Sequence, residues 1–178
     1  MVKTIIVNVV ATASVNQEMD FEELGKYKEI FHDPDVYGGR VAYFKTQKME
    51  GKVSIFSSGK MISVGTRSEK RAFQELTSAM KFLVEKDLAK PVKLDLKTRN
   101  MVITADFEKS LNLEKLAEDT RAIYEPEQFP GAILRFDKPF KASILVFASG
   151  KTVITGLTNT SQIEPTIHRL ERFIEENK

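Results

Sequence analysis

The feature that most constrains the fold of this chain is an internal repeat of about 90 residues. Three segments recur in the same order, 91 or 92 residues apart: residues 7–13 and 99–105, residues 33–37 and 125–129, and residues 55–60 and 146–151. The spacing changes from 92 to 91 between Tyr37 and Phe56, so the first copy is one residue longer there. The repeat predicts a pseudo-symmetric protein built from two copies of one module, residues 1–91 and 92–178.

The hydrophobic periodicity within each copy predicts the order β-α-β-β-β-α. In the first copy we expect strands at 2–15, 40–44, 52–56 and 61–64, and helices at about 20–30 and 68–89. In the second copy we expect strands at about 93–106, 132–137, 142–148 and 152–156, and helices near 112–121 and 161–176. Adjacent strands followed by a helix favour the α+β class, with a curved antiparallel sheet and the helices on one side.

The composition excludes several kinds of chemistry. There is no cysteine, which removes disulfides, thiol catalysis and cysteine-bound zinc. The two histidines, His32 and His168, are far apart, so a histidine-rich metal site is not expected. No apolar run reaches 18 residues and no signal peptide is evident, so we expect an intracellular protein without a membrane span. The net charge is only +2, so any nucleic-acid site must depend on where the basic residues lie.

The sheet face away from the helices is the predicted binding surface, because it must meet solvent or a partner. Strand alternation places a mostly apolar set with a few short polar side chains on that face: Asn8, Val10, Thr12, Ile62, Val64, Asn100, Val102, Thr104, Leu145, Val153 and Thr155. A broad apolar face usually marks an interaction surface. The minor groove of A·T-rich DNA offers acceptors and no guanine amine, so it matches such a face. Asn8 and Asn100 would donate to these acceptors, although they also fit as polar residues at strand edges.

Basic and aromatic residues at the ends of the strands extend this hypothesis. Phosphate contacts are expected at the edges, from Lys60, Lys151, Arg135, Ser58 and Ser149, although lysines in turns are often simply solvated. Apolar wedges inserted between base steps kink a duplex. Phe56 and Phe147 precede the Ser-Gly-Lys turns, and Tyr37 and Phe129 follow proline-containing loops, so each copy offers one pair of wedges. The two phenylalanines before the turns also fit as ordinary core residues.

Over nearly its whole length the sequence resembles the TATA-box-binding protein family. The most specific matches are Tyr-Glu-Pro-Glu-Gln-Phe-Pro-Gly at 124–131, Phe-Ala-Ser-Gly-Lys at 147–151 and Val-Ile-Thr-Gly at 153–156. The first copy matches more loosely, through residues 8–12 and 55–61. The lack of an N-terminal extension looks like the archaeal form.

The resemblance implies a saddle of two pseudo-symmetric halves that binds and bends double-stranded promoter DNA. It also implies a role in the pre-initiation complex of RNA polymerase and a transcription factor B partner. That partner would dock on the second copy's loop, which carries Glu125, Glu127 and Gln128. The family needs no cofactor or metal and catalyses nothing. Free saddles of this type are also candidates for homodimers.

The first copy departs from the family pattern at several positions. Tyr37 stands where an intercalating phenylalanine is usual, and Gly38-Gly39 replaces Pro-Gly after it. The alignment places Tyr43 opposite Arg135, Ser54 opposite Leu145 and Val64 opposite Thr155. The first copy is therefore the less faithful DNA surface.

The sequence is compatible with three classes of function. The first is a general transcription initiation factor, and the second is a diverged paralogue that acts mainly as a protein-interaction adapter with weak DNA binding. The third is an enzyme that carries a similar saddle domain. The chain has little room for a catalytic domain besides the two copies, and no nucleophile–base pair stands out in its sequence.

Overall fold

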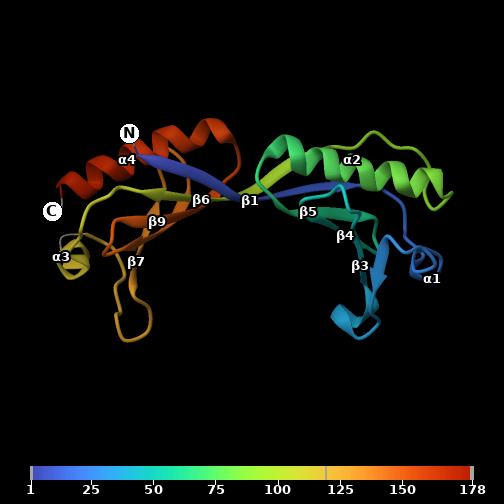
Figure 1. Cartoon of the computed structure of the whole chain (residues 1–178), viewed down its shortest axis with the longest axis horizontal. Helices are drawn as coiled ribbons and strands as arrows, with labels where there is room; N and C mark the ends of the chain where they lie inside the picture. The colour runs from blue at the N-terminus through green and yellow to red at the C-terminus, as the bar shows by residue number, and fades with distance from the viewer. Residues whose placement is uncertain (1, 119, 177–178) are drawn as a thin grey trace. The chain divides into compact units, whose positions relative to one another are not determined.

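The computed structural model describes residues 2–118 and 120–176, and the chain forms two compact units. The N-terminal unit comprises residues 8–99 and the C-terminal unit comprises residues 2–7 and 100–176. Each unit contains an antiparallel sheet with a long helix along one side of it (Figure 1). The predicted α+β class is confirmed. The predicted order β-α-β-β-β-α is found in the second copy, whereas the first copy has one further strand, β2, after its first helix.

The N-terminal unit holds most of the first copy of the repeat. Its elements are β1 (Lys3–Ser14, which starts in the other unit), α1 (Phe21–Leu24), β2 (Ile30–His32), the 3-10 helix η1 (Val36–Gly39), β3 (Val41–Phe44), β4 (Lys52–Phe56), β5 (Lys60–Thr66) and α2 (Glu69–Glu85). The strands lie in the order β2-β3-β4-β5-β1. Each described pair of neighbours is antiparallel.

The C-terminal unit repeats this plan with fewer strands. Its elements are β6 (Lys97–Asp106, which starts in the other unit), α3 (Leu113–Glu118), β7 (Gly131–Phe136), β8 (Ala142–Phe147), β9 (Lys151–Leu157), the 3-10 helix η2 (Thr160–Gln162) and α4 (Ile163–Glu176). The strands lie in the order β6-β9-β8-β7, and each pair is antiparallel.

The helix predicted over residues 20–30 is wrong beyond its first turn. Asp20 caps α1 as expected, because its side chain accepts the backbone N–H groups of Glu22 and Glu23. The helix ends at Leu24, next to Gly25, a residue that favours helix ends. Ile30 instead lies in strand β2, where it is buried and pairs with Phe44 of β3. In the C-terminal unit the corresponding contact is a single bridge between Ile123 and Ile133.

The other predicted boundaries need smaller corrections. Helix α2 ends at Glu85 and not near Pro91, because Asp87 takes a left-handed backbone (φ 56°) and the N–H of Leu88 donates back to Leu83. Strand β6 starts at Lys97 and not near residue 93. Helix α3 ends at Glu118, three residues before the predicted end.

The core of the N-terminal unit lies between α2 and the inner sheet face. The helical spacing predicts an apolar stripe that also includes Val84, which is half-buried. The other members of the stripe are buried: Ala72, Leu76, Ala79, Met80 and Leu83. Alternate strand residues such as Val53, Ile55 and Met61 are fully buried against it. Ser68 caps the helix through the N–H of Arg71. Because α2 packs on one face of the sheet, it leaves the opposite face uncovered.

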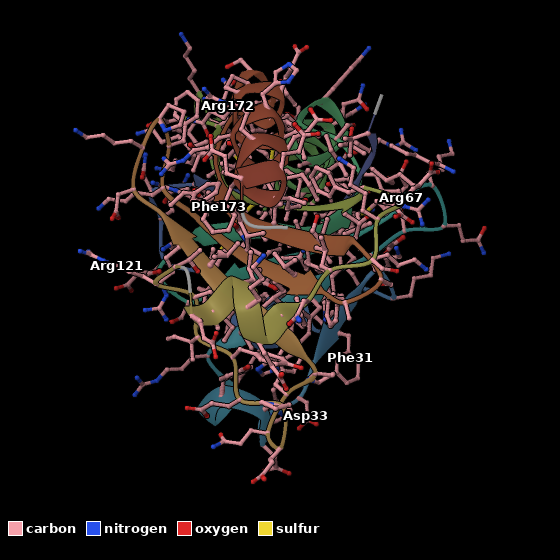
Figure 2. The ribbon with its side chains drawn as sticks, turned by 90° about the vertical axis from the view of Figure 1, so that its left-hand side faces the viewer. Phe31, Asp33, Arg67, Arg121, Arg172 and Phe173 are labelled. Carbon is pink, nitrogen blue, oxygen red and sulfur yellow. The ribbon has the colours of Figure 1, made fainter. Side chains whose placement is uncertain are left out.

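The C-terminal unit is packed in the same way by α4. Ile167, Leu170 and Ile174 are buried on this helix. Phe173 (labelled in Figure 2) meets the ring of Phe136 of β7 edge-on, with the ring centroids 6.1 Å apart.

The packing of α2 leads to a stability prediction. Leu76 is fully buried, so Leu76→Ala removes buried methyl groups and leaves a cavity. We expect the free energy of unfolding to fall by about 2–5 kcal/mol, measured by denaturant titration. Gln74→Ala, on the exposed side of the same helix, should change it by less than about 0.5 kcal/mol. Equal effects of the two substitutions would contradict the proposed packing.

Candidate nucleic-acid interface

The open face of each sheet carries the side chains that the alternation predicts. Most of their strand neighbours are buried in the core, although Val7, Gly65, Arg99 and Gly156 are exposed. The following residues of the predicted face are half-buried: Asn8, Val10, Ile62, Val64, Asn100, Val102, Thr104, Leu145, Val153 and Thr155. Thr12 differs, since it is only 8% exposed. The Nε of Arg99 donates to its hydroxyl at 2.9 Å and helps to cover it. Both units therefore present a shallow face of apolar and short polar groups.

The two asparagines of this face share one anchoring device. The backbone N–H of Gly65 donates to Oδ1 of Asn8 at 2.8 Å, and that of Gly156 donates to Oδ1 of Asn100 at 2.7 Å. In each case the sheet register slips by one residue beside the glycine, whose φ is +92° or +100°. Such a bulge with a left-handed glycine is a recurrent feature of antiparallel sheets.

The hydrogen bond from the glycine determines which atom of each asparagine amide remains available to bind a ligand. A backbone N–H can be accepted only by the amide oxygen, so the orientation of both side chains follows from the hydrogen bond. Within the described residues, neither Nδ2 atom donates to another protein group. Asn8 and Asn100 are thus held as hydrogen-bond donors. The sequence contains the signal for this arrangement, a matched Asn and Gly in both copies, but the bulge was not predicted.

The predicted wedge pair of the C-terminal unit forms a contact. The rings of Phe129 and Phe147 meet edge-on with centroids 5.8 Å apart, and Phe129 remains 37% exposed. Gly131 lies opposite Phe147 in the β7–β8 ladder. A Cβ atom at position 131 would lie 2.8 Å from Cε1 of Phe129 and 3.1 Å from Cε1 of Phe147. The glycine therefore provides the space in which the two rings meet.

The corresponding pair in the N-terminal unit is not assembled in the same way. Tyr37 is 78% exposed and its backbone is left-handed, with φ 50°. Val41 takes the place of the glycine, because it pairs with Phe56 in the β3–β4 ladder. In the described part of the chain no ring contact joins Tyr37 to Phe56.

The ladders also correct one alignment of the two copies. Tyr43 pairs with Ser54 and Ile133 pairs with Leu145, so Tyr43 corresponds to Ile133 and not to Arg135. The first copy has two extra residues between Tyr37 and Val41, and one fewer in the following hairpin, which together make the single-residue difference. The spacing of the repeat in the sequence reveals only the sum of these two changes, which is one residue.

Lys45 is the residue that corresponds to Arg135 by register. Its Nζ donates to the carbonyl oxygens of Met49 and Glu50, each at 2.9 Å, and to that of Gly51. This lysine is used to hold the loop between β3 and β4. Arg135, in contrast, is exposed on β7 opposite Ser143.

The two hairpin turns at the sheet edges have the same geometry. Gly59 and Gly150 both have φ +82°, and their N–H groups donate to the carbonyls of Phe56 and Phe147 at 2.8 and 2.9 Å. The turn residues proposed to contact phosphates are all exposed: Ser58, Lys60, Ser149 and Lys151.

The loop before β7 carries the predicted partner-binding residues. Glu125, Glu127 and Gln128 are exposed. The carbonyl of Glu125 accepts the N–H groups of Gln128 and Phe129, each at 2.9 Å, so the loop is a compact turn next to the wedge.

An aromatic and basic cluster on β2–β4 was missed by the sequence analysis. Phe31 (labelled in Figure 2) is 62% exposed and stacks on Tyr43 with centroids 6.4 Å apart. Nζ of Lys52 lies 4.2 Å from the centre of the Tyr43 ring. The cluster depends on β2, which was not predicted as a strand and whose first residue, Ile30, fell at the end of the predicted helix.

Known proteins resemble this chain in sequence. The sequence profile of the family described as "Transcription factor TFIID (or TATA-binding protein, TBP)" matches residues 3–85 and 95–177. This chain belongs to the TATA-binding protein family. The TATA-box-binding protein of Cenarchaeum symbiosum is 38% identical over 160 residues, which cover 89% of this chain and 86% of that protein. TATA-box-binding protein 2 of Haloferax volcanii is 36% identical over 96% of this chain and 92% of that protein.

A solved member of the TATA-binding protein family has the same fold. The structure of Methanococcus jannaschii TBP superposes with a TM-score of 0.86 at 30% identity, and the match covers 98% of this chain and 99% of that one. The family resemblance inferred from the sequence motifs is thus confirmed, and these relatives are archaeal.

The described residues contain neither a candidate metal site nor a membrane-spanning helix. No group of three or more histidine and acidic side chains is placed to hold a metal ion there. No helix in the described ranges is long and apolar enough to cross a membrane.

Proposed function

We propose that this protein is a general transcription initiation factor that binds A/T-rich promoter DNA through the minor groove and bends it. The observation that carries the proposal is the pair of anchored asparagines. Asn8 and Asn100 occupy matched positions on the open faces, and each keeps an amide N–H₂ group for acceptors. The floor of an A·T minor groove presents only acceptors, whereas a G·C pair adds a competing donor.

The side chains around the asparagines support the same reading. Val10, Val102 and Val153 present an apolar surface that can contact the floor of a widened minor groove. Such a surface makes no base-specific hydrogen bond. The wedge pair Phe129 and Phe147 is suited to unstack a base step and kink the duplex. Phosphate contacts by Lys60, Lys151, Arg135, Ser58 and Ser149 then fix the register.

The proposed protein partner is transcription factor B, as part of a pre-initiation complex with RNA polymerase. The exposed turn with Glu125, Glu127 and Gln128 supports this, because two carboxylates beside the DNA wedge suit a basic partner that also reaches the DNA. We propose no cofactor and no catalytic role.

The promoter hypothesis is tested by gel shift and by a bending assay on matched duplexes. We expect at least tenfold tighter binding to a duplex with central TA steps than to a G·C-rich duplex of equal length, because pyrimidine–purine steps deform easily. The bound A/T-rich duplex should also be bent. Equal affinity for both duplexes without bending would rule the function out.

A second candidate is a diverged adapter that binds a protein partner and touches DNA weakly. The exposed, left-handed Tyr37 and the Val41 opposite Phe56 favour it, since they weaken one of the two wedges. Capture of purified transcription factor B without detectable DNA binding would favour the adapter. Loss of that capture in Glu125→Gln/Glu127→Gln would locate the docking turn.

A further inference from the structure

A basic groove lies beside the hairpin turn of the N-terminal unit. One wall comes from the end of β1 and the β4–β5 turn, and the other from the segment that leads into β6. The groove is lined by Thr12, Ser14, Ser58, Lys60, Lys93, Asp95, Lys97 and Arg99, together with Ala13 and Asn16. Only Thr12, Ser58 and Lys60 in this set were predicted to contact DNA.

The segment of residues 92–99 separates its apolar and charged side chains by strict alternation. Leu94 and Leu96 are half-buried and share a hydrophobic pocket with Met80 and Val84 of α2. The intervening residues Lys93, Asp95, Lys97 and Arg99 are exposed and line the basic groove. Because Leu94 and Leu96 face the pocket beside α2, the charged side chains between them are directed into the groove on the other side of the segment.

Side-chain hydrogen bonds hold this segment on the N-terminal unit. The amide of Gln17 makes two bonds to Lys90, accepting from its N–H at 2.8 Å and donating to its carbonyl at 2.9 Å. The hydroxyl of Thr98 donates to Glu69 at 2.8 Å, and Arg99 donates to Thr12 at 2.9 Å. The groove is therefore formed before any ligand binds.

The charge of the groove suits a polyanion. Its lining has four cationic side chains and one carboxylate, Asp95, which gives a formal charge of +3. Asp95 forms an ion pair with Lys97, with its Oδ2 atom 2.6 Å from Nζ, and pairs with none of the other three cationic side chains of the lining. The hydroxyl groups of Ser14 and Ser58 add neutral donors of the kind that contact phosphate oxygens.

The pseudo-equivalent groove in the C-terminal unit differs in charge. It is lined by Lys3, Ile5, Asp106 and Lys151 with Phe147 and Thr104, so two cations and one anion give +1. By the repeat spacing of 92, Ile5 corresponds to Lys97. The extra charge is thus a property of the N-terminal unit, which also has the less complete wedge.

We propose that Lys60, Lys93 and Lys97 form a phosphate-binding groove that anchors the DNA backbone on the N-terminal unit. The inference rests on the proposed DNA-binding function and adds residues to it. Strand β1 carries both Thr12, which lines the groove beneath Arg99, and the open-face residues Asn8 and Val10, so a duplex bound on that face brings its backbone to the lysines. Attraction between these lysines and the DNA phosphates then adds to the affinity that the Tyr37 and Phe56 wedge provides. This added affinity does not depend on the DNA sequence.

The test is the salt dependence of binding to one A/T-rich duplex. Each phosphate contact adds about 0.9 to the slope of log K against log salt, so Lys93→Gln/Lys97→Gln should lower the slope by about 2. Affinity near 0.1 M salt should fall by about tenfold, equally for A/T-rich and G·C-rich duplexes, because phosphate contacts carry no base information.

Two further variants make the test specific. Lys70→Gln/Lys81→Gln on the exposed side of α2 makes the same change in net charge and should leave the slope within about 0.5 of the parent value. Asp95→Asn frees Lys97 and should act in the opposite direction, raising affinity severalfold. If the unaltered protein binds and bends DNA but both lysine pairs have equal slopes, the groove is refuted and the function stands. If the unaltered protein does not bind DNA, both are refuted.

Discussion

Asn100→Asp is expected to lower the affinity for an A/T-rich duplex by about 100-fold, since a hydrogen bond to a base is lost and a charge is left without a partner. The substitution preserves the bulge, because an aspartate oxygen accepts the N–H of Gly156 as Oδ1 of Asn100 does now. It replaces the free N–H₂ donor by an acceptor, which faces the acceptors of the groove floor. The change therefore separates DNA recognition from folding. Affinity is measured by gel shift, and folding by thermal unfolding.

Asn112→Asp is the matched control for this experiment. Asn112 caps helix α3 by accepting the N–H of Lys115 at 3.0 Å, a role that aspartate fills equally well. It makes the same change in charge in the same unit, but it does not lie on a strand of the open face. If both variants bind DNA equally well, the amide of Asn100 is not a DNA contact.

The second large effect is expected at the wedges, where the two units should respond unequally. Phe129 is held against Phe147, so little side-chain entropy is lost when it inserts into DNA. Phe129→Ala should reduce affinity by about 10- to 100-fold, the range for loss of one aromatic–base stacking contact, and should visibly reduce the bend. Both changes are measured on one fluorescently labelled duplex.

Tyr37→Ala should have a smaller effect, roughly threefold or less, because this exposed side chain must be ordered on insertion. Its phenol hydroxyl must also keep a hydrogen-bond partner inside the base stack. The two variants act as controls for one another, since each removes one aromatic ring from a matched position. A larger effect of Tyr37→Ala would show that the N-terminal wedge is the dominant one.

Much of the fold was predictable because its signals are local. The repeat gave the number of modules, and the alternation in β1 and β6 assigned Asn8 and Asn100 to the open face. The amphipathic stripe of α2 predicted its buried apolar residues except that Val84 is half-buried, and it did not predict the buried Glu75. The failure near Ile30 has a tertiary cause, because pairing with Phe44 of β3 makes a strand at the end of the segment that was predicted as helix.

The sequence by itself determined the family, the two-copy architecture and the residues that the two open faces present. Only the tertiary structure decided how the side chains of these residues are oriented and which of them are in contact, because both depend on residues far apart in the chain. Gly65 and Gly156 orient the asparagines from a neighbouring strand, and Gly131 makes room for the rings of Phe129 and Phe147. Likewise, Lys93 and Lys97 line one groove with Lys60, because Leu94 and Leu96 on the alternate side of the segment face α2.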